Sequence, residues 1–70
     1  MSTPFAVSVN GEERDVASGT TLEALVATLS SAHSGVAAAL NETVVPRAQW
    51  PTTPLSAGDR VEVLTAVQGG

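Results

Sequence analysis

The sequence predicts an α+β domain: a mixed sheet of four to five strands with one main helix packed on one face. Three observations predict this fold. Alternating apolar residues indicate strands at 5–9 and 61–65, near the two ends of the chain. An apolar stripe at helical spacing lies between them, within 20–29. The chain has 70 residues, 43% of them hydrophobic, which suits one small domain with a single core.

The first two strands are expected to form a hairpin. Asn10-Gly11 directly follows the strand at 5–9, and both residues tolerate the positive φ angles of a two-residue turn. The return strand at 12–16 is mostly charged, which suits an edge strand, where charge discourages aggregation. Its acidic residues Glu12, Glu13 and Asp15 also suggest a metal cluster, but a solvated strand face is favoured because no histidine or further acid is close in sequence.

The helix is predicted to open at Thr20. Thr20 and Glu23 have the spacing of a capping box, in which the hydroxyl and the carboxylate satisfy free backbone N–H groups. The apolar stripe, expected in the core, comprises Leu22, Leu25, Val26 and Leu29. A loop follows over 30–35, with the helix ending at Gly35 or just before it. His33 in this loop is read as an exposed residue and not a catalytic one, because no nucleophile or orienting acid is placed for it.

The apolar run at 36–40 is predicted to be a buried central strand, although its alanines also favour helix. A turn at Asn41-Glu42 leads to a short strand at 44–45, which Pro46 ends because proline cannot donate to a ladder. Pro46 is then expected at the first position of one helical turn over 47–50.

Trp50 is expected to cover the open end of the core, since a base-stacking platform would need more aromatic and basic residues. Residues 51–54 should run as an extended loop, and Leu55 should fill the core. The turn at 56–59 then leads into the final strand.

Composition excludes several classes of function. The net charge of −4, with only Arg14, Arg47 and Arg60 as basic residues, disfavours binding to nucleic acid or to an anionic membrane. The absence of cysteine excludes disulfides, thiolate catalysis and cysteine-ligated zinc, and the absence of lysine excludes a P-loop and Schiff-base chemistry. No apolar run is long enough to span a membrane and no signal peptide is visible, so a cytoplasmic location is expected.

The chain closes on Gly69-Gly70, directly after the strand at 61–65. Paired glycines can pass a constriction that any other residue would block, because glycine has no Cβ. A rigid strand would hold one end of such a tail and leave the α-carboxylate of Gly70 accessible to a partner. The alternative from this motif alone is a frayed terminus without a chemical role.

The order of elements, with the final strand central and beside the first, best matches the β-grasp or ubiquitin-like architecture. Residues 1–66 then form the domain and 67–70 a flexible carboxyl-terminal tail. The second half of the chain also carries an ordered set of short motifs: Ala39-Leu40-Asn41, Val44-Val45-Pro46-Arg47, Trp50, Pro54-Leu55, Gly58-Asp59-Arg60-Val61-Glu62 and Ala66-Val67-Gln68-Gly69-Gly70. Through these motifs the chain resembles the ThiS family of thiamine-biosynthesis sulfur carriers.

The resemblance implies a carrier protein and not an enzyme. Gly70 would be the sulfur-bearing residue and Gly69 a slim spacer, with Val67 and Gln68 docked in a partner's channel and an apolar patch on the sheet adding affinity. A terminal carboxylate is ionised at neutral pH and is a poor electrophile, so it needs activation. In the family, an E1-like adenylyltransferase uses ATP and Mg²⁺ to form the acyl-adenylate. A persulfide donor of the cysteine desulfurase or rhodanese type then yields a thiocarboxylate, which gives its sulfur to thiazole synthase.

Three other functions stay open at this point. The chain could carry sulfur for molybdopterin, cysteine or another product, because such carriers share the fold and the tail. It could be a modifier that conjugates to target lysines through Gly70. It could also be a β-grasp interaction module with an inert tail. Removal of Gly70 separates these classes, because only a pure binding module would keep its activity.

Overall fold

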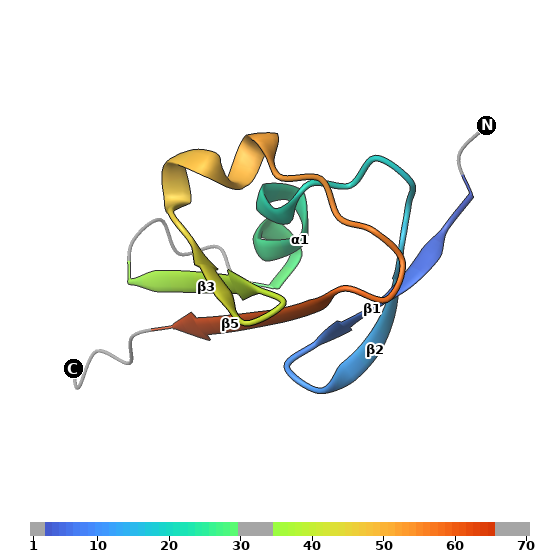
Figure 1. The fold of residues 1–70 in the computed structure, drawn as a ribbon, viewed down its shortest axis with the longest axis horizontal. Coiled ribbons are helices and arrows are strands. Elements are labelled where there is room, and N and C mark those ends of the chain that lie inside the picture. Colours follow the sequence, from blue (N-terminus) through green and yellow to red (C-terminus); the bar gives the residue numbers. More distant parts are fainter. Residues whose placement is uncertain (1–2, 30–34, 66–70) are drawn as a thin grey trace.

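The computed structural model describes residues 3–29 and 35–65, which form a five-stranded mixed sheet with one α-helix on one face (Figure 1). The strand order is β2-β1-β5-β3-β4. Central β5 is parallel to β1 and antiparallel to β3, and the two outer pairs are antiparallel. The β-grasp prediction is therefore confirmed. The elements are β1 (Phe5–Val9), β2 (Glu12–Val16), α1 (Leu22–Leu29), β3 (Val36–Leu40), β4 (Thr43–Val45), the 3₁₀ helix η1 (Arg47–Thr52) and β5 (Arg60–Thr65).

The amino-terminal hairpin has the predicted geometry. β1 pairs with β2 from Phe5↔Val16 to Val9↔Glu12, and the two turn residues between them have positive φ angles, 50° at Asn10 and 85° at Gly11. These angles belong to a type I′ turn, whose twist matches that of the two strands. β2 lies at the sheet edge with its charged residues exposed, as the sequence indicates.

Helix α1 begins at Leu22, so the prediction of a capping box on Thr20 is wrong. The Thr20 hydroxyl donates to the carbonyl oxygen of Ala17 at 2.6 Å, and the Thr21 hydroxyl oxygen accepts from the N–H of Ala24 at 3.2 Å. The reason lies far along the chain. Leu22 N–H donates to the Thr53 carbonyl at 2.8 Å and Leu55 N–H to the Thr20 carbonyl at 3.0 Å. These contacts hold Thr20 and Thr21 outside the helix.

The predicted apolar stripe does face the sheet. Leu22, Leu25 and Val26 are buried, and Leu29 packs against the core from its edge. The predicted loop residues 30–34, including His33, lie outside the described residues.

Strand β3 lies between β5 and β4, but the prediction that it is buried is only half right. Ala38 is buried, whereas its neighbour Ala37 is exposed. The helix covers one face of the sheet and leaves these alternate residues on the other face. The turn at Asn41-Glu42 is confirmed, with φ angles of 51° and 72°, and Pro46 follows the last residue of β4 as expected.

The helical turn predicted over 47–50 is longer than expected. It continues through Pro51 to Thr52, so the prediction of an extended loop is wrong for these two residues. Pro46 is not its first residue but its N-cap, in an extended conformation with ψ 143°. A fixed φ near −65° lets Pro51 sit within a short helix. The Thr53 hydroxyl and N–H donate to the Gln49 and Trp50 carbonyls, at 2.6 Å and 3.2 Å, and close its end.

The core lies between α1, η1 and the inner face of the sheet. Trp50 is 4% exposed and its Nε1–H donates to the Val45 carbonyl at 2.8 Å, which confirms its predicted place over the end of the core. Leu55 is also buried, as expected. The buried apolar residues are Val7, Val9, Leu22, Leu25, Val26, Ala38, Trp50, Leu55, Val61 and Val63.

Candidate functional site

The predicted site residues Val67, Gln68, Gly69 and Gly70 lie outside the described residues. The structure does place the strand from which they continue. β5 is the central strand of the sheet and ends at Thr65, the last described residue. Fully extended, the five residues that follow reach at most about 18 Å. Any protein that contacts Gly70 must therefore also lie close to the end of β5.

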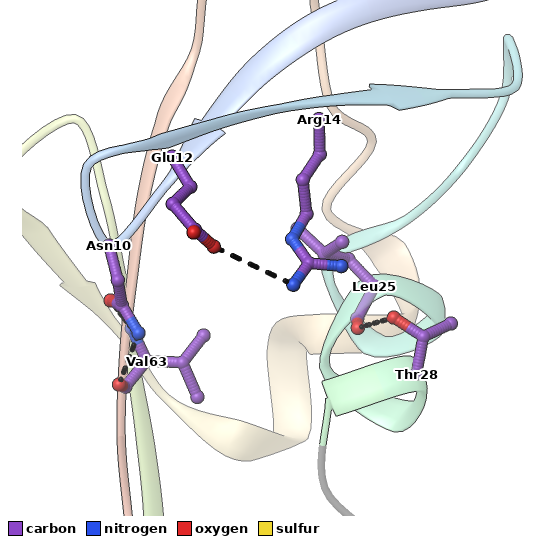
Figure 2. A network of polar contacts seen from close by, with 6 residues as sticks. All are labelled: Asn10, Glu12, Arg14, Leu25, Thr28 and Val63. Atoms are coloured by element: carbon purple, nitrogen blue, oxygen red, sulfur yellow. Dashed lines mark hydrogen bonds and ion pairs between the residues drawn. The ribbon is translucent and has the colours of Figure 1, made fainter.

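Strand β5 is held differently on its two sides. β3 pairs with it up to its last residue, through the register from Leu40↔Val61 to Val36↔Thr65. β1 pairs with it only through Ser8↔Arg60 and Val9↔Val61. Beyond that point the Asn10 side chain takes over: its Oδ1 accepts from the N–H of Val63 at 2.9 Å, and its Nδ2 donates to the carbonyl of Val63 at 3.2 Å (Figure 2).

The turn that leads into β5 is closed by local hydrogen bonds, as the sequence predicts. The N–H of Ser56 donates to Asp59 Oδ2 at 2.7 Å, and the N–H of Asp59 donates to the Ser56 carbonyl at 3.1 Å. Gly58 has a φ angle of 83°, a conformation that favours glycine. This turn sets the position at which the chain enters the centre of the sheet.

The sheet face opposite the helix carries an exposed apolar surface, which we call the open-face patch. It consists of Ala37 and Ala39 on β3, Val44 on β4 and Leu64 on β5, and these residues line a shallow depression bordered by Asn10, Glu42 and Glu62. Val44 is 73% exposed and Leu64 71% exposed. Because Leu64 directly precedes Thr65, this patch adjoins the end of β5. The acidic border suits a partner with an apolar surface edged by basic residues.

The acidic residues among those described do not gather into a cluster. Among residues 3–29 and 35–65, no three His, Asp or Glu side chains lie close enough together to hold a metal ion. Glu12, Glu13 and Asp15 are exposed on the edge strand, as the solvated-face interpretation expects. No polar or charged residue in the described ranges is buried. None of the described helices has the length and apolar character to cross a membrane.

For two features of this region, the sequence analysis did not identify the residues involved. The Asn10-Gly11 pair indicates a turn, but it does not reveal that the Asn10 side chain bonds Val63, 53 positions away. The patch was expected on the sheet without named residues. A signal for Leu64 was present, because alternation along β5 places it on the face opposite the buried Val61 and Val63.

Comparison with known proteins agrees with this geometry. The family model described as the ThiS family matches residues 7–70. The sulfur carrier protein ThiS of Escherichia coli K12 is 31% identical over 61 residues, which are 87% of this chain and 92% of that protein. The crystal structure of thiamine biosynthesis protein ThiS from Geobacter metallireducens has a TM-score of 0.76 and 30% identity, and the match covers 94% of this chain and 100% of that one.

A second kind of relative is much longer. A thiazole synthase of Paramagnetospirillum magneticum is 32% identical over 62 residues. The match covers 89% of this chain but 19% of that protein, so the chain spans less than a fifth of its length.

Proposed function

The chain belongs to the ThiS family of thiamine-biosynthesis sulfur carriers, and from this premise we propose that Gly70 is the residue that carries the sulfur. The observation that carries the proposal is the family match, which covers residues 7–70 and therefore includes Gly69 and Gly70. The end of β5 and the open-face patch support it, because they offer a partner a docking surface beside the strand that leads to Gly70.

The chemistry proceeds on partner enzymes, with this chain as their substrate. An oxygen of the Gly70 carboxylate attacks the α-phosphorus of ATP on an E1-like adenylyltransferase, which uses Mg²⁺, and pyrophosphate leaves. The terminal sulfur of a persulfide on a cysteine desulfurase or rhodanese then attacks the carbonyl carbon, and AMP leaves. A second thiol then attacks the donor's cysteine sulfur in the resulting acyl disulfide, and the S–S bond breaks. The two thiol sulfurs form a disulfide, and Gly70 keeps the transferred sulfur as a thiocarboxylate.

Thiazole synthase is the proposed recipient of the sulfur. A segment similar to nearly all of this chain occurs within a protein named thiazole synthase, and this supports a direct association between carrier and synthase. Adenylation needs ATP, the sulfur transfer needs a persulfide, and release of the thiocarboxylate needs a thiol. These requirements are consistent with the expected cytoplasmic location. The chain itself contributes the fold, the docking surface and the reactive terminus.

The proposal predicts a defined mass change. After incubation with ATP, Mg²⁺, a persulfide donor and the adenylating enzyme, the chain should gain the mass difference between one sulfur and one oxygen atom, and fragmentation should place that change on Gly70. Omission of ATP is the control, because the unactivated carboxylate is a poor electrophile. Thiazole formation with the synthase then tests the pathway. If the chain that carries the thiocarboxylate supports formation of molybdopterin or cysteine and not of the thiazole, the assignment to thiamine is contradicted.

We assign docking of the adenylating enzyme to the open-face patch. Leu64→Asp is expected to raise the KM for the carrier about tenfold or more, because a carboxylate within an apolar contact loses hydration without gaining a partner. The kcat should change less, since Gly70 is intact. Adenylation is measured by pyrophosphate release.

Ala57→Asp is the matched control for this variant. It adds the same charge at an exposed position in the turn before β5, at the opposite end of the strand from Leu64. Its KM should stay within twofold of wild type. Equal increases in both variants would show that net charge and not the open-face patch governs docking.

A further inference from the structure

Two asparagines hold β5, one toward each end, in a similar way. Asn10 lies in the turn between β1 and β2 and Asn41 in the turn between β3 and β4, with φ angles of 50° and 51°. Each side-chain Oδ1 accepts a hydrogen bond at 2.9 Å from a β5 backbone N–H, that of Val63 for Asn10 and that of Arg60 for Asn41. Asn41 thus acts at the first residue of β5, and Asn10 acts near its end.

The Asn10 side chain extends the ladder after the main chain of β1 has turned away. The backbone N–H of Asn10 still donates to the Val61 carbonyl at 2.9 Å, but the hairpin turn begins at this residue. A carboxamide offers a donor and an acceptor, as a peptide group does. It therefore satisfies both the N–H and the carbonyl of Val63, a residue that is only 8% exposed. Both hydrogen bonds are partly buried, so leaving the two backbone groups without partners would be destabilising.

The contact between Asn10 and Val63 lies close to the point where the tail begins. Val63 lies two residues before Thr65, where β5 ends. In the described residues the β1 register stops at Val9↔Val61, so on that side of the strand Asn10 makes the contact nearest to the tail. On the other side β3 pairs through Thr65. Without the Asn10 carboxamide, the pairing with β3 would be the contact that remains at the end of β5 among the residues that the structure describes.

We infer that Asn10 is a positioning residue for sulfur loading: its carboxamide fixes the end of β5 and so the point from which the chain continues toward Gly70 when a partner is docked. This inference rests on the proposed function. The residue type fits the task. Asparagine tolerates positive φ, whereas glycine at the same position would remove both hydrogen bonds and aspartate would set a carboxylate oxygen against the Val63 carbonyl.

The test compares Asn10→Gly with the matched variant Asn41→Gly. Glycine keeps the positive φ of each turn, so each variant removes one side chain that bonds β5. Amide hydrogen exchange is the first measurement. Asn10→Gly should speed exchange at Val63 about tenfold or more, and Asn41→Gly should do so at Arg60 and leave Val63 close to wild type. Exchange at Val63 that is unchanged in Asn10→Gly would overturn the anchoring contact.

The second measurement separates positioning from stability. In adenylation by the partner enzyme, at a temperature where circular dichroism shows all variants folded, Asn10→Gly should lower kcat about tenfold, because small misplacements of a reacting group have large effects on rate. Its KM should change less than its kcat, because the four apolar residues of the open-face patch are retained, although Asn10 also lines the depression there. A rise in KM without a fall in kcat would show that Asn10 acts in docking and would refute the positioning role. Asn41→Gly should leave both constants within twofold. If Asn10→Gly does not fold, Asn10→Asp, which retains the acceptor for the Val63 N–H, takes its place in the comparison.

The outcomes distinguish this inference from the proposed function. A wild-type chain that is not adenylated at all would refute the proposed function. A wild-type chain that is adenylated, together with an Asn10→Gly variant of unchanged kcat, would refute the positioning role alone. An equal fall in kcat for Asn10→Gly and Asn41→Gly would also refute it, because the effect would then follow the general stability of β5.

Discussion

Gly69→Trp is expected to abolish sulfur loading while the domain stays folded. The proposed partner must admit the last residues of the chain into a buried active site, and an indole at position 69 would fill the space that only a hydrogen occupies in glycine. The expected loss in the rate of thiocarboxylate formation is more than a hundredfold. Position 69 lies beyond the described core, so the unfolding midpoint in urea should match that of wild type.

Two further variants make this experiment specific. Ala57→Trp adds the same side chain at an exposed position in the turn before β5 and should load normally. Gly69→Ala should fall between wild type and Gly69→Trp, because a single methyl group obstructs a narrow passage less than an indole does. Normal loading of Gly69→Trp would show that the partner has no narrow passage.

Removal of Gly70 tests the class of protein. A carrier or a modifier of other proteins loses all activity without its terminal glycine, since the reacting carboxylate is displaced by one residue. A pure interaction module would still bind its partner and keep its function. Partner binding measured beside sulfur loading separates these cases, because the open-face patch is unchanged in the shortened chain.

The sequence predicted those parts of the fold that depend on neighbouring residues. Alternation identified β1 and β5, and the Asn10-Gly11 pair identified the turn that the φ angles confirm. Helical spacing identified the buried face of α1. In each case the physical cause, side-chain periodicity or backbone conformation, acts within a few residues and is therefore visible in a short window.

The predictions that failed depend on contacts between distant segments. The start of α1 is set by hydrogen bonds from Leu22 to Thr53 and from Leu55 to Thr20, which no local pattern reveals. The continuation of η1 through Pro51 accompanies the burial of Trp50 in a core to which β1, α1 and β5 also contribute. The contact of Asn10 with Val63 likewise requires knowledge of which strands become neighbours.

The candidate site was predicted unevenly. The role of Gly70 came from the resemblance and stays a prediction, because Val67 to Gly70 lie outside the described residues. The structure adds what surrounds the approach to the tail: the central strand that leads to it, the open-face patch beside it and the Asn10 contact. These features arise from the packing of four strands. The sequence alone could therefore indicate an apolar patch on the sheet, but not the residues that form it.

Trp50→Ala is expected to lower the free energy of unfolding by about 3–5 kcal/mol. The indole is 4% exposed and lies over the end of the core, so alanine leaves a large cavity. The variant also leaves the Val45 carbonyl without the Nε1–H donor that bonds it at 2.8 Å. Small domains have a total stability near the lower end of about 5–15 kcal/mol, so a large fraction of this variant should be unfolded at 37 °C. Urea unfolding followed by far-ultraviolet circular dichroism measures the change.

Arg47→Ala is the control for this variant. The guanidinium of Arg47 lies 5.4 Å from the centre of the Trp50 ring, but Arg47 is exposed, so its removal should change the stability by less than about 1 kcal/mol. Trp50→Phe should lie between the two, because phenylalanine refills most of the volume without restoring the hydrogen bond. A Trp50→Ala midpoint equal to wild type would contradict the central place of this side chain in the core.

The same variant asks whether the folded body is needed for sulfur loading. Trp50→Ala keeps every residue of the tail and of the open-face patch. In the unfolded fraction of this variant, however, the sheet that brings these residues together is lost. If docking and alignment both depend on β5, the rate of loading should fall in proportion to the folded fraction measured under the same conditions. Addition of an osmolyte that restores folding should restore loading to the same degree. Loading at the wild-type rate by an unfolded chain would show that the tail alone is recognised, and the roles proposed for the open-face patch and for Asn10 would both be wrong.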